Sequence, residues 1–347
     1  MKKLLSIFVI AVLLFGALSL AVVNNKAQAQ DKYKIALVLS GFLGDESFND
    51  SAHRGLKRAE EDFNIETTVL ESDKSDEWEQ NVISSATSDY DLVIGVSTQF
   101  EDIIDKNAPQ FPDTAFALID GAVDHPNVAS AVFAQNEGSF LAGAAAAMFT
   151  QHDEIEGVNS DKKIGWVGGM DVPVLHDFLV GYKQGAKHID PDVEVLNSFA
   201  GTFNDPVKGK ELTLSQYDQG ADIVMNVASG TGRGIIEAAD EADKYAIGVD
   251  LNQDDIYPGN ILTSMVKRVD RATYTIIESL VEDDFAGGEV VTMDLNNGGV
   301  ELTDMSVMKE ELGDDFPDEI LDRIEELTEE IKNGEIEVDS YEGFSVE

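Results

Sequence analysis

Ser40-Gly41-Phe42-Leu43-Gly44-Asp45-Glu46-Ser47-Phe48-Asn49 follows the apolar run 34–39 and precedes a stretch, 52–63, with apolar residues at helical spacing. A continuous apolar run of this length is typical of a buried parallel strand, and the helical spacing predicts an amphipathic helix. The quoted stretch is therefore the first strand-to-helix turn of an α/β unit. In a doubly wound sheet, ligands bind at such turns.

The chemistry of this turn is richer than a simple connection needs. Asp45 and Asn49 offer hydrogen-bond acceptors and donors, and Phe48 offers a flat ring for stacking. Alternatively, Ser47 or Asp50 caps the following helix. Capping and ligand binding are compatible, so the residues alone leave both open.

Strand-like and helix-like stretches alternate along the chain after this turn. Because strand–helix repeats indicate parallel sheets with helices on both faces, the sequence predicts an α/β fold with two similar doubly wound lobes. An alanine-rich helix, 137–150, separates the two halves and is expected to pack closely on another element. The expected strands are 35–39, 66–71, 92–96, 114–119 and 128–133 in the first half, and 163–169, 194–199, 222–227 and 245–249 in the second.

The C-terminal part adds further elements after both halves are complete. Strand-like runs at 260–266 and 290–295 flank a helical stretch, 269–282, and an acidic amphipathic helix follows Pro317. This order predicts that the chain recrosses between the lobes, with a cleft between them. The predicted boundaries are 31–135 plus 253–287 for the N-terminal lobe, and 136–252 plus 288–347 for the C-terminal lobe.

The composition narrows the function further. The 347 residues carry a net charge of −43, which repels phosphate backbones, so we expect no nucleic-acid partner. The chain has no cysteine, and its five histidines lack the spacing of a zinc site, so no metal or cofactor is expected. A heavily carboxylated surface that salt would screen suggests a halophilic source.

The N-terminus has the pattern of a targeting segment. Lys2 and Lys3 precede the apolar run 4–23, and Ala27-Gln28-Ala29 is a small-x-small cleavage site. We expect residues 1–29 to be a signal peptide, export of the protein, and a mature start near Gln30. The run is also long enough to remain as a membrane anchor.

Polar groups gather where the predicted strands end, which is the ligand-binding edge of an open α/β sheet. Carboxylates, amides and two aromatic rings dominate, with few cations, and this suits a neutral, hydroxyl-rich ligand with a flat ring. Asp250 and Lys267 are either a simple ion pair or a clamp for vicinal hydroxyls. The groups are Asp45 to Asn49, Ser97, Asp120, Gly168-Gly169, Phe203 to Asp205, Ser229 to Gly232, Asp250 and Lys267.

Two other patterns have both a functional and an ordinary structural interpretation. Gly230-x-Gly232-x-Gly234 follows a strand, but it is not a dinucleotide fingerprint, so a tight turn is favoured over a phosphate site. No nucleophile or metalloprotease motif is present, and no catalytic residue is assigned. Asp45 and Asp250 leave acid/base chemistry open.

Several motifs together resemble the basic membrane protein family of ABC-transporter substrate-binding proteins, whose characterised members bind purine nucleosides. No single motif is specific, but the set runs through most of the chain to about residue 280. The matching stretches are 44–49, 120–121, 136–143, 167–173, 181–186, 203–205, 220–222, 247–250 and 263–267.

The resemblance implies a type I periplasmic-binding-protein fold with two lobes and a hinge. It implies that Phe48 and Phe203 sandwich a purine base while Asp45 and Asn49 bind its edge. Family members are commonly lipoproteins, and the absence of cysteine excludes that anchor here. The full set of expected ligand-binding residues is Asp45, Phe48, Asn49, Ser97, Asp120, Gly169, Phe203, Gly230, Asp250 and Lys267, with Asp120, Asp250 and Lys267 on the ribose and Gly230 behind the sugar.

The expected function is that of an exported binding protein for guanosine, adenosine or inosine. Its expected partners are an ABC permease and ATPase, with membrane contact only through them or an uncleaved N-terminal segment. The alternatives are a nucleoside or sugar sensor of the same fold, and a nucleoside hydrolase.

Overall fold

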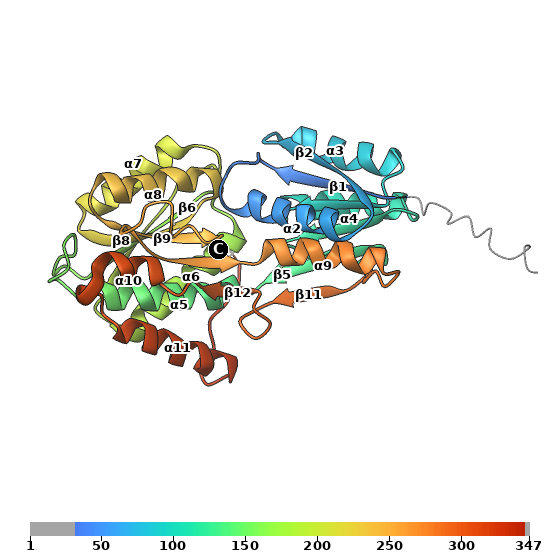
Figure 1. Cartoon of the computed structure of the whole chain (residues 1–347). Coiled ribbons are helices and arrows are strands. Elements are labelled where there is room, and N and C mark those ends of the chain that lie inside the picture. Colours follow the sequence, from blue (N-terminus) through green and yellow to red (C-terminus); the bar gives the residue numbers. More distant parts are fainter. Residues whose placement is uncertain (1–31, 344–347) are drawn as a thin grey trace, which may run out of the picture. The chain divides into compact units, whose positions relative to one another are not determined.

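Two six-stranded sheets form the framework of the protein (Figure 1), in a computed structural model that describes residues 32–343. The predicted signal peptide and cleavage site lie outside the described residues. All strand pairings are parallel except that of β10 with β12. The first sheet has the order β11-β5-β4-β3-β1-β2, with β1 Tyr33–Ser40, β2 Ile65–Ser72, β3 Leu92–Val96, β4 Ala115–Ile119, β5 Val128–Phe133 and β11 Val290–Met293. The second has the order β12-β10-β9-β8-β6-β7, with β6 Lys163–Gly168, β7 Glu194–Phe199, β8 Ala221–Val227, β9 Tyr245–Asp250, β10 Ile261–Lys267 and β12 Val300–Leu302.

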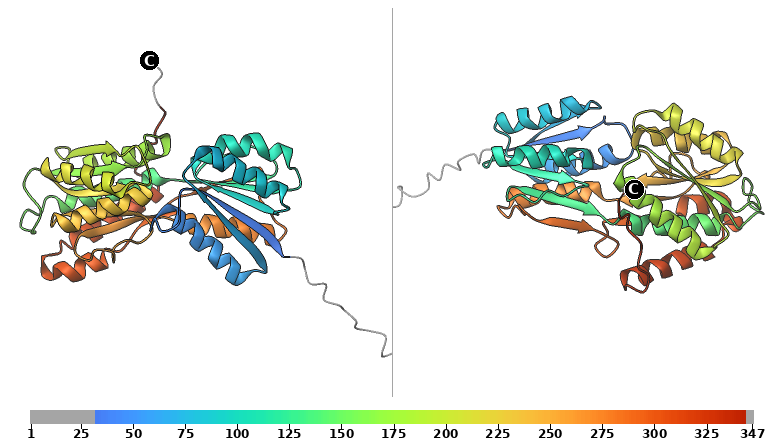
Figure 2. Two further views of the ribbon diagram at one scale, coloured as in Figure 1. Left: turned by 90° about the horizontal axis from the view of Figure 1, so that it is seen from above. Right: turned by 180° about the vertical axis from the view of Figure 1, so that it is seen from behind.

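Helices cover both faces of each sheet, which confirms the predicted doubly wound architecture (Figures 1 and 2). The two sheets form two lobes of the type I periplasmic-binding-protein fold. Around the first sheet lie α2 Phe48–Asp62, α3 Ser75–Thr87, α4 Glu101–Asn107 and α9 Val269–Val281. Around the second lie α5 Gln135–Phe149, α6 Pro173–Ile189, α7 Pro206–Asp218, α8 Gly232–Glu241, α10 Ser306–Leu312 and α11 Glu319–Lys332.

Strand β1 shows how the sequence determines these layers. Successive side chains on a strand point to opposite faces, so a strand buried on both faces needs an unbroken apolar run. Ile35, Leu37 and Leu39 share a core with α2 and α9. Ala36 and Val38 face a second core with α3 and α4, which also buries Trp78.

Helices α5 and α6 pack backbone against backbone in the second lobe. A Cβ on Gly143 would lie 2.0 Å from the Tyr182 carbonyl oxygen, and one on Gly185 would lie 1.9 Å from that of Phe140. Only glycine permits this approach. The prediction that the alanine-rich helix packs closely is confirmed, because its alanines are buried.

Three short segments connect the lobes, and they lie close together. They follow β5, β10 and β11, and hydrogen bonds join them: Ala134 N–H donates to Met293 O at 2.9 Å, and Arg268 N–H donates to Gly299 O at 2.9 Å. Figure 2 shows the chain passing between the lobes in this region. A hinge of this kind permits the two lobes to rotate relative to each other about the connecting segments.

The sheet order corrects the predicted lobe boundaries. Residues 253–287 were assigned to the N-terminal lobe and 288–347 to the C-terminal lobe, but β10 belongs to the second sheet and β11 to the first. β10 pairs with β9 in the second sheet, and β11 pairs with β5 in the first sheet. Each strand therefore lies in the lobe opposite to the predicted one. Strand pairing over such sequence separations is decided by tertiary packing, which residue spacing does not encode.

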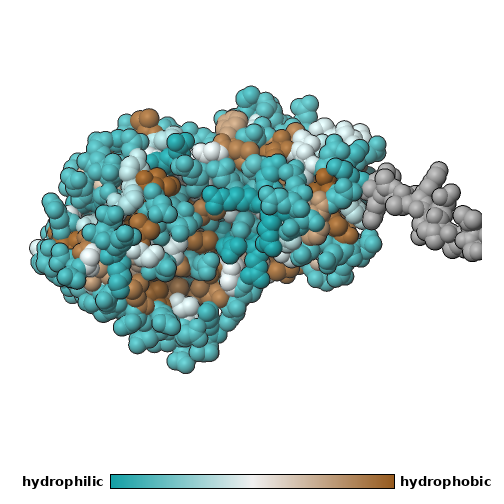
Figure 3. Space-filling view, in the orientation of Figure 1, coloured by the Kyte–Doolittle hydropathy of each residue, from teal (hydrophilic) through white to brown (hydrophobic). Residues whose placement is uncertain are grey.

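On the face shown in Figure 3, hydrophilic residues cover most of the described surface. Ile320, Ile324, Leu327 and Ile331 of α11 are buried, as the predicted apolar face of the last helix requires. Among the described residues, no helix combines the length and apolar composition needed to span a membrane.

Candidate functional site

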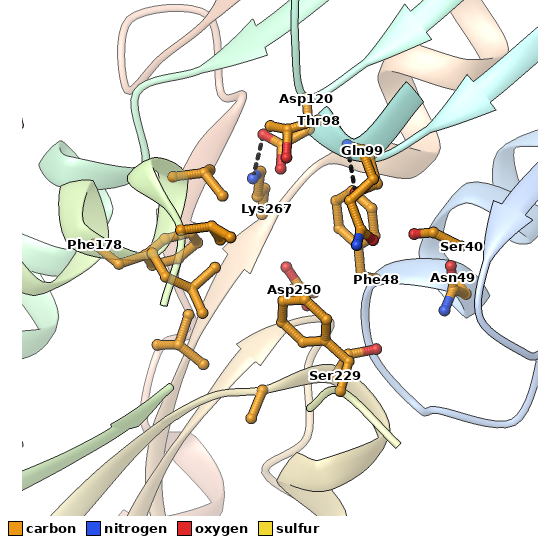
Figure 4. Close-up of a pocket in the computed structure, with 17 residues that line it drawn as sticks. Ser40, Phe48, Asn49, Thr98, Gln99, Asp120, Phe178, Ser229, Asp250 and Lys267 are labelled. Carbon is orange, nitrogen blue, oxygen red and sulfur yellow. Dashed lines mark hydrogen bonds and ion pairs between the residues drawn. The ribbon is translucent and has the colours of Figure 1, made fainter. Parts of the chain in front are cut away.

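A cavity with about 660 Å³ of empty space lies between the two lobes (Figure 4). This volume includes space that is open to solvent. The first lobe contributes Ser40, Phe48, Asn49, Ser97, Thr98, Gln99 and Asp120. The second contributes Val172, Val174, Leu175, Phe178, Phe203, Val227, Ala228, Ser229, Asp250 and Lys267.

Four cavity residues have backbone conformations that side chains seldom adopt. The φ angles are 129° at Ser97, 73° at Asp120, 49° at Ser229 and 64° at Asp250. Each residue lies at or just beyond the end of a parallel strand, two from each sheet. A non-glycine residue in such a region costs on the order of 1–3 kcal/mol and persists only where its surroundings hold it. These four residues lie together at the cavity, and six other non-glycine residues of the described chain also have a positive φ.

The N-terminus of α2 is organised around Asp45. Its carboxylate accepts backbone N–H groups from Ser47 at 3.0 Å, Asn49 at 2.9 Å and Asp50 at 3.0 Å. These are donors that a helix start leaves without intrahelical partners, and the negative charge also suits the positive end of the helix. The predicted caps act differently: the side chain of Ser47 makes no cap bond, and Asp50 accepts N–H groups of the preceding turn.

Lys267 is the buried cation of the cavity. Its side chain is 2% exposed, and its Nζ donates to Asp120 Oδ1 at 2.6 Å. Three aromatic rings surround the ammonium, with centroids 5.4 Å away for Phe48, 4.8 Å for Phe133 and 5.2 Å for Phe178. Cation–π attraction at these distances compensates part of the cost of burying the charge. Lys267 thus forms its ion pair with Asp120. An ion pair with Asp250 was one of the two alternatives predicted from the sequence.

Burial changes the acidity of both carboxyl groups near Lys267. Removal from water raises the pKa of Asp250 to about 7, although the positive charge of Lys267 and a hydrogen bond from Ser47 oppose the rise. Burial also raises the pKa of Asp120, again against Lys267. Both effects follow because a low-dielectric site disfavours the charged form of a carboxyl group. The cavity therefore holds one ammonium group and two buried carboxyl groups. Further hydrogen-bond donors would stabilise the charged form of each carboxyl group.

Seven of the ten predicted ligand-binding residues line this one cavity, and three lie just behind it. Asp45, Gly169 and Gly230 do not line it. A Cβ on Gly169 would come within 2.2 Å of the Phe203 ring, so the glycine leaves room for that ring. A Cβ on Gly230 would lie 3.1 Å from the Phe203 carbonyl oxygen. Their roles toward a ligand stay predictions.

Some lining residues were not among the ten expected ligand-binding residues. Ser40, Thr98 and Gln99 lie at or just after the ends of β1 and β3, so their place at the predicted edge would have found them, as it found Ser229. The apolar wall from the start of α6 had no such signal. Its members are Val172, Val174, Leu175 and Phe178.

The glycines after β8 serve packing. A Cβ on Gly234 would lie 1.7 Å from the Pro206 carbonyl oxygen, and one on Gly232 would lie 2.2 Å from Asn226 Oδ1. These contacts support the tight-turn alternative. Within residues 32–343, no group of three or more histidine or acidic side chains is placed to hold a metal ion.

Two hinged α/β lobes around a polar and aromatic cavity define a solute-binding protein of the periplasmic type. A family profile described as "ABC transporter substrate-binding protein PnrA-like" (Bmp) matches residues 32–342. The chain therefore belongs to this family, as the resemblance in its motifs indicated, and it is a substrate-binding protein of an ABC transporter.

Individual relatives agree with this assignment. The chain is 32% identical over 341 residues to an ABC transporter nucleoside-binding protein, BmpA, of Lactococcus lactis, with 91% of each chain covered. It is 30% identical over 322 residues to basic membrane protein A2 of Borrelia garinii, with 90% of each covered. A solved ABC-transporter solute-binding protein of Aeropyrum pernix matches with a TM-score of 0.84 and 28% identity, over 90% of this chain and 94% of that one.

Proposed function

We propose that this protein binds purine nucleosides for an ABC importer. The observation that carries the proposal is the pair of rings, Phe48 from the first lobe and Phe203 from the second, in one cavity with the Asp120–Lys267 ion pair and Asp250. Flat rings from opposite lobes suit a heterocycle, and paired charges suit vicinal hydroxyls. The nucleoside-binding description of the L. lactis relative points the same way.

Each part of a nucleoside has a matching group in the proposal. Phe48 and Phe203 line the cavity from opposite lobes, so in this proposal the base stacks against both rings. Asn49 Oδ1 is buried without a hydrogen-bond partner, so a base N–H would satisfy it. Asp120, Asp250 and Lys267 would bind the ribose hydroxyls.

The charges of the cavity also argue against nucleotides. Lys267 is the single cation among the lining residues, and Asp120 already pairs with it. A 5′-phosphate would bring about two negative charges close to Asp120 and Asp250. We therefore expect nucleosides to bind and their monophosphates to bind much more weakly.

Calorimetric titration with guanosine, adenosine and inosine tests the proposal. Uridine, ribose and guanosine monophosphate are the controls. Ligand at about 100 times its Kd stabilises a folded protein by about 2.7 kcal/mol, so thermal shifts give a second readout. If none of the three purine nucleosides gives a heat of binding or a change in melting temperature, the nucleoside assignment is refuted.

We further propose that the protein is exported and that its ligand-bound, closed form docks on the permease and its ATPase. Substrate-binding proteins of ABC importers work outside the cytoplasmic membrane, so the N-terminal segment is expected to direct export. Mass spectrometry of the mature protein tests for a start near Gln30, and a retained residue 1–29 segment would show anchoring. Uptake of radiolabelled nucleoside by cells with and without the gene separates transport from sensing.

In this proposal the protein binds its ligand without catalysing a reaction on it. The family to which the chain belongs is described as one of substrate-binding proteins. Incubation with inosine followed by chromatography for hypoxanthine tests this directly. Release of free base at a rate proportional to protein concentration would instead establish a hydrolase.

A further inference from the structure

The turn formed by residues 44–47, here called the latch turn, is held by the second lobe through protein groups alone. Ser229 Oγ donates to Asp45 Oδ2 at 2.7 Å, and Ser47 Oγ donates to the Asp250 carboxylate. Asp45 is 5% exposed, Ser47 is fully buried and Asp250 is 6% exposed. These hydrogen bonds join the lobes in a site largely shielded from water.

Two further side chains of the second lobe bind the same turn. Gln253 is 2% exposed, and its Nε2 donates to the Glu46 carbonyl oxygen at 2.8 Å. At the rim, Arg233 lies 3.7 Å from the Glu46 carboxylate and 3.4 Å from the Gly44 carbonyl oxygen. Contacts therefore run from the buried part of the cleft to its edge.

None of these contacts needs a ligand. Asp45 keeps its three backbone N–H donors whether or not Ser229 is near, so the first lobe presents a preorganised acceptor. The groups would be hydrated again in an open form, so each bond favours closure only modestly. Together these bonds shift the equilibrium between open and closed forms toward the closed form, and the open form remains populated.

We propose that the latch turn, with Ser229, Asp250 and Gln253, populates the closed conformation before any ligand arrives. Ligand then binds from an equilibrium of open and closed forms, and its contacts with both lobes complete a shift that the protein has begun. Ser47, Ser229 and Gln253 act as positioning residues for the lobes. The inference rests on the proposed role as a binding protein, but it does not depend on which ligand binds.

Distance measurement between spin labels on the two lobes tests this. The chain has no cysteine, so Asp102→Cys on α4 and Val207→Cys on α7 provide two unique labelling sites. Both residues are exposed, and each helix starts near a cavity residue, so their separation changes as the cleft opens. Electron–electron double resonance is recorded on the ligand-free protein. The labelled parent is compared with a variant that carries both Ser47→Ala and Ser229→Ala.

The ligand-free parent should show a short-distance population that matches the closed structure. The double alanine variant should reduce the ratio of closed to open forms about tenfold or more, while Ser84→Ala, an exposed serine within α3, should leave it unchanged. If the double variant does not fold, Ser47→Ala alone should give a smaller change of the same sign. A single long distance in the parent, or an unchanged distribution in the folded variants, would overturn the proposal.

A final arm with guanosine keeps the two proposals apart. If guanosine restores the short distance in the double variant, both the latch and nucleoside binding are supported. If guanosine has no effect on any variant, the nucleoside proposal fails. The comparison of ligand-free samples still decides the latch.

Discussion

Replacing Asp250 with asparagine should remove a pH dependence from the stability of the protein. Burial raises the pKa of Asp250 from 3.8 to about 7 in the folded state. At about 1.4 kcal/mol for each pKa unit, this difference corresponds to about 4 kcal/mol, an upper limit for the single group. Asparagine has nearly the same shape and does not titrate, so the variant isolates the charge.

The sign follows from proton uptake. Between about pH 4 and pH 7 the folded protein binds a proton at Asp250 that the unfolded chain has released. The free energy of unfolding therefore falls as pH rises through this range, and it levels off above pH 7. Asp120 and Asp254 have pKa values raised by burial and act in the same direction, so the informative quantity is the difference between parent and variant.

Urea unfolding of parent and Asp250→Asn at about pH 4.5, 6 and 8, in constant high salt, measures that difference. The variant should gain stability relative to the parent as pH rises, by up to about 4 kcal/mol across the range. Asp304→Asn is the control: hydrogen bonds from Ser306 lower the pKa of Asp304, so its contribution changes only below this range. A parent–variant difference that is the same at all three pH values would refute the assignment of a proton to Asp250.

Three further outcomes are expected. Phe203→Ala should weaken purine-nucleoside binding about 10- to 100-fold, from about 1–3 kcal/mol of lost stacking, while Phe42→Ala at an exposed site outside the cavity should not; equal effects would contradict the sandwich. Gly143→Ala should destabilise the protein by about 2 kcal/mol or more, because its Cβ would lie 2.0 Å from the Tyr182 carbonyl oxygen, and an unchanged melting temperature would disprove this close packing. Raising NaCl from about 0.05 to 2 M should raise the melting temperature, because salt screens a net charge of −43; an equal rise with sucrose would instead indicate surface exclusion.

The fold could be predicted where the signal was local. The strand 92–96 was predicted with the bounds that β3 has, because an apolar run between polar turns leaves few alternatives. The apolar face of α11 was equally clear from the spacing of Ile320, Ile324, Leu327 and Ile331. Each of these patterns is complete within one element.

Features that depend on two distant segments could not be predicted in this way. The exchange of β10 and β11 between lobes depends on pairing partners more than ten residues away. The N–H partners of Asp45 depend on where α2 begins, and the left-handed backbone at Ser97 depends on neighbours from other strands. The apolar wall at the start of α6 looks like any other helix until the hinge brings it against the first lobe.

The exchanged strand has a consequence for the order of folding during synthesis. The sheet that starts at Tyr33 receives its last strand from residues 290–293, so the N-terminal lobe stays incomplete until most of the chain has left the ribosome. A cut at any single position between β1 and β12 would leave at least one sheet without a strand. Efforts to prepare either lobe alone should therefore fuse the separated segments rather than truncate the gene.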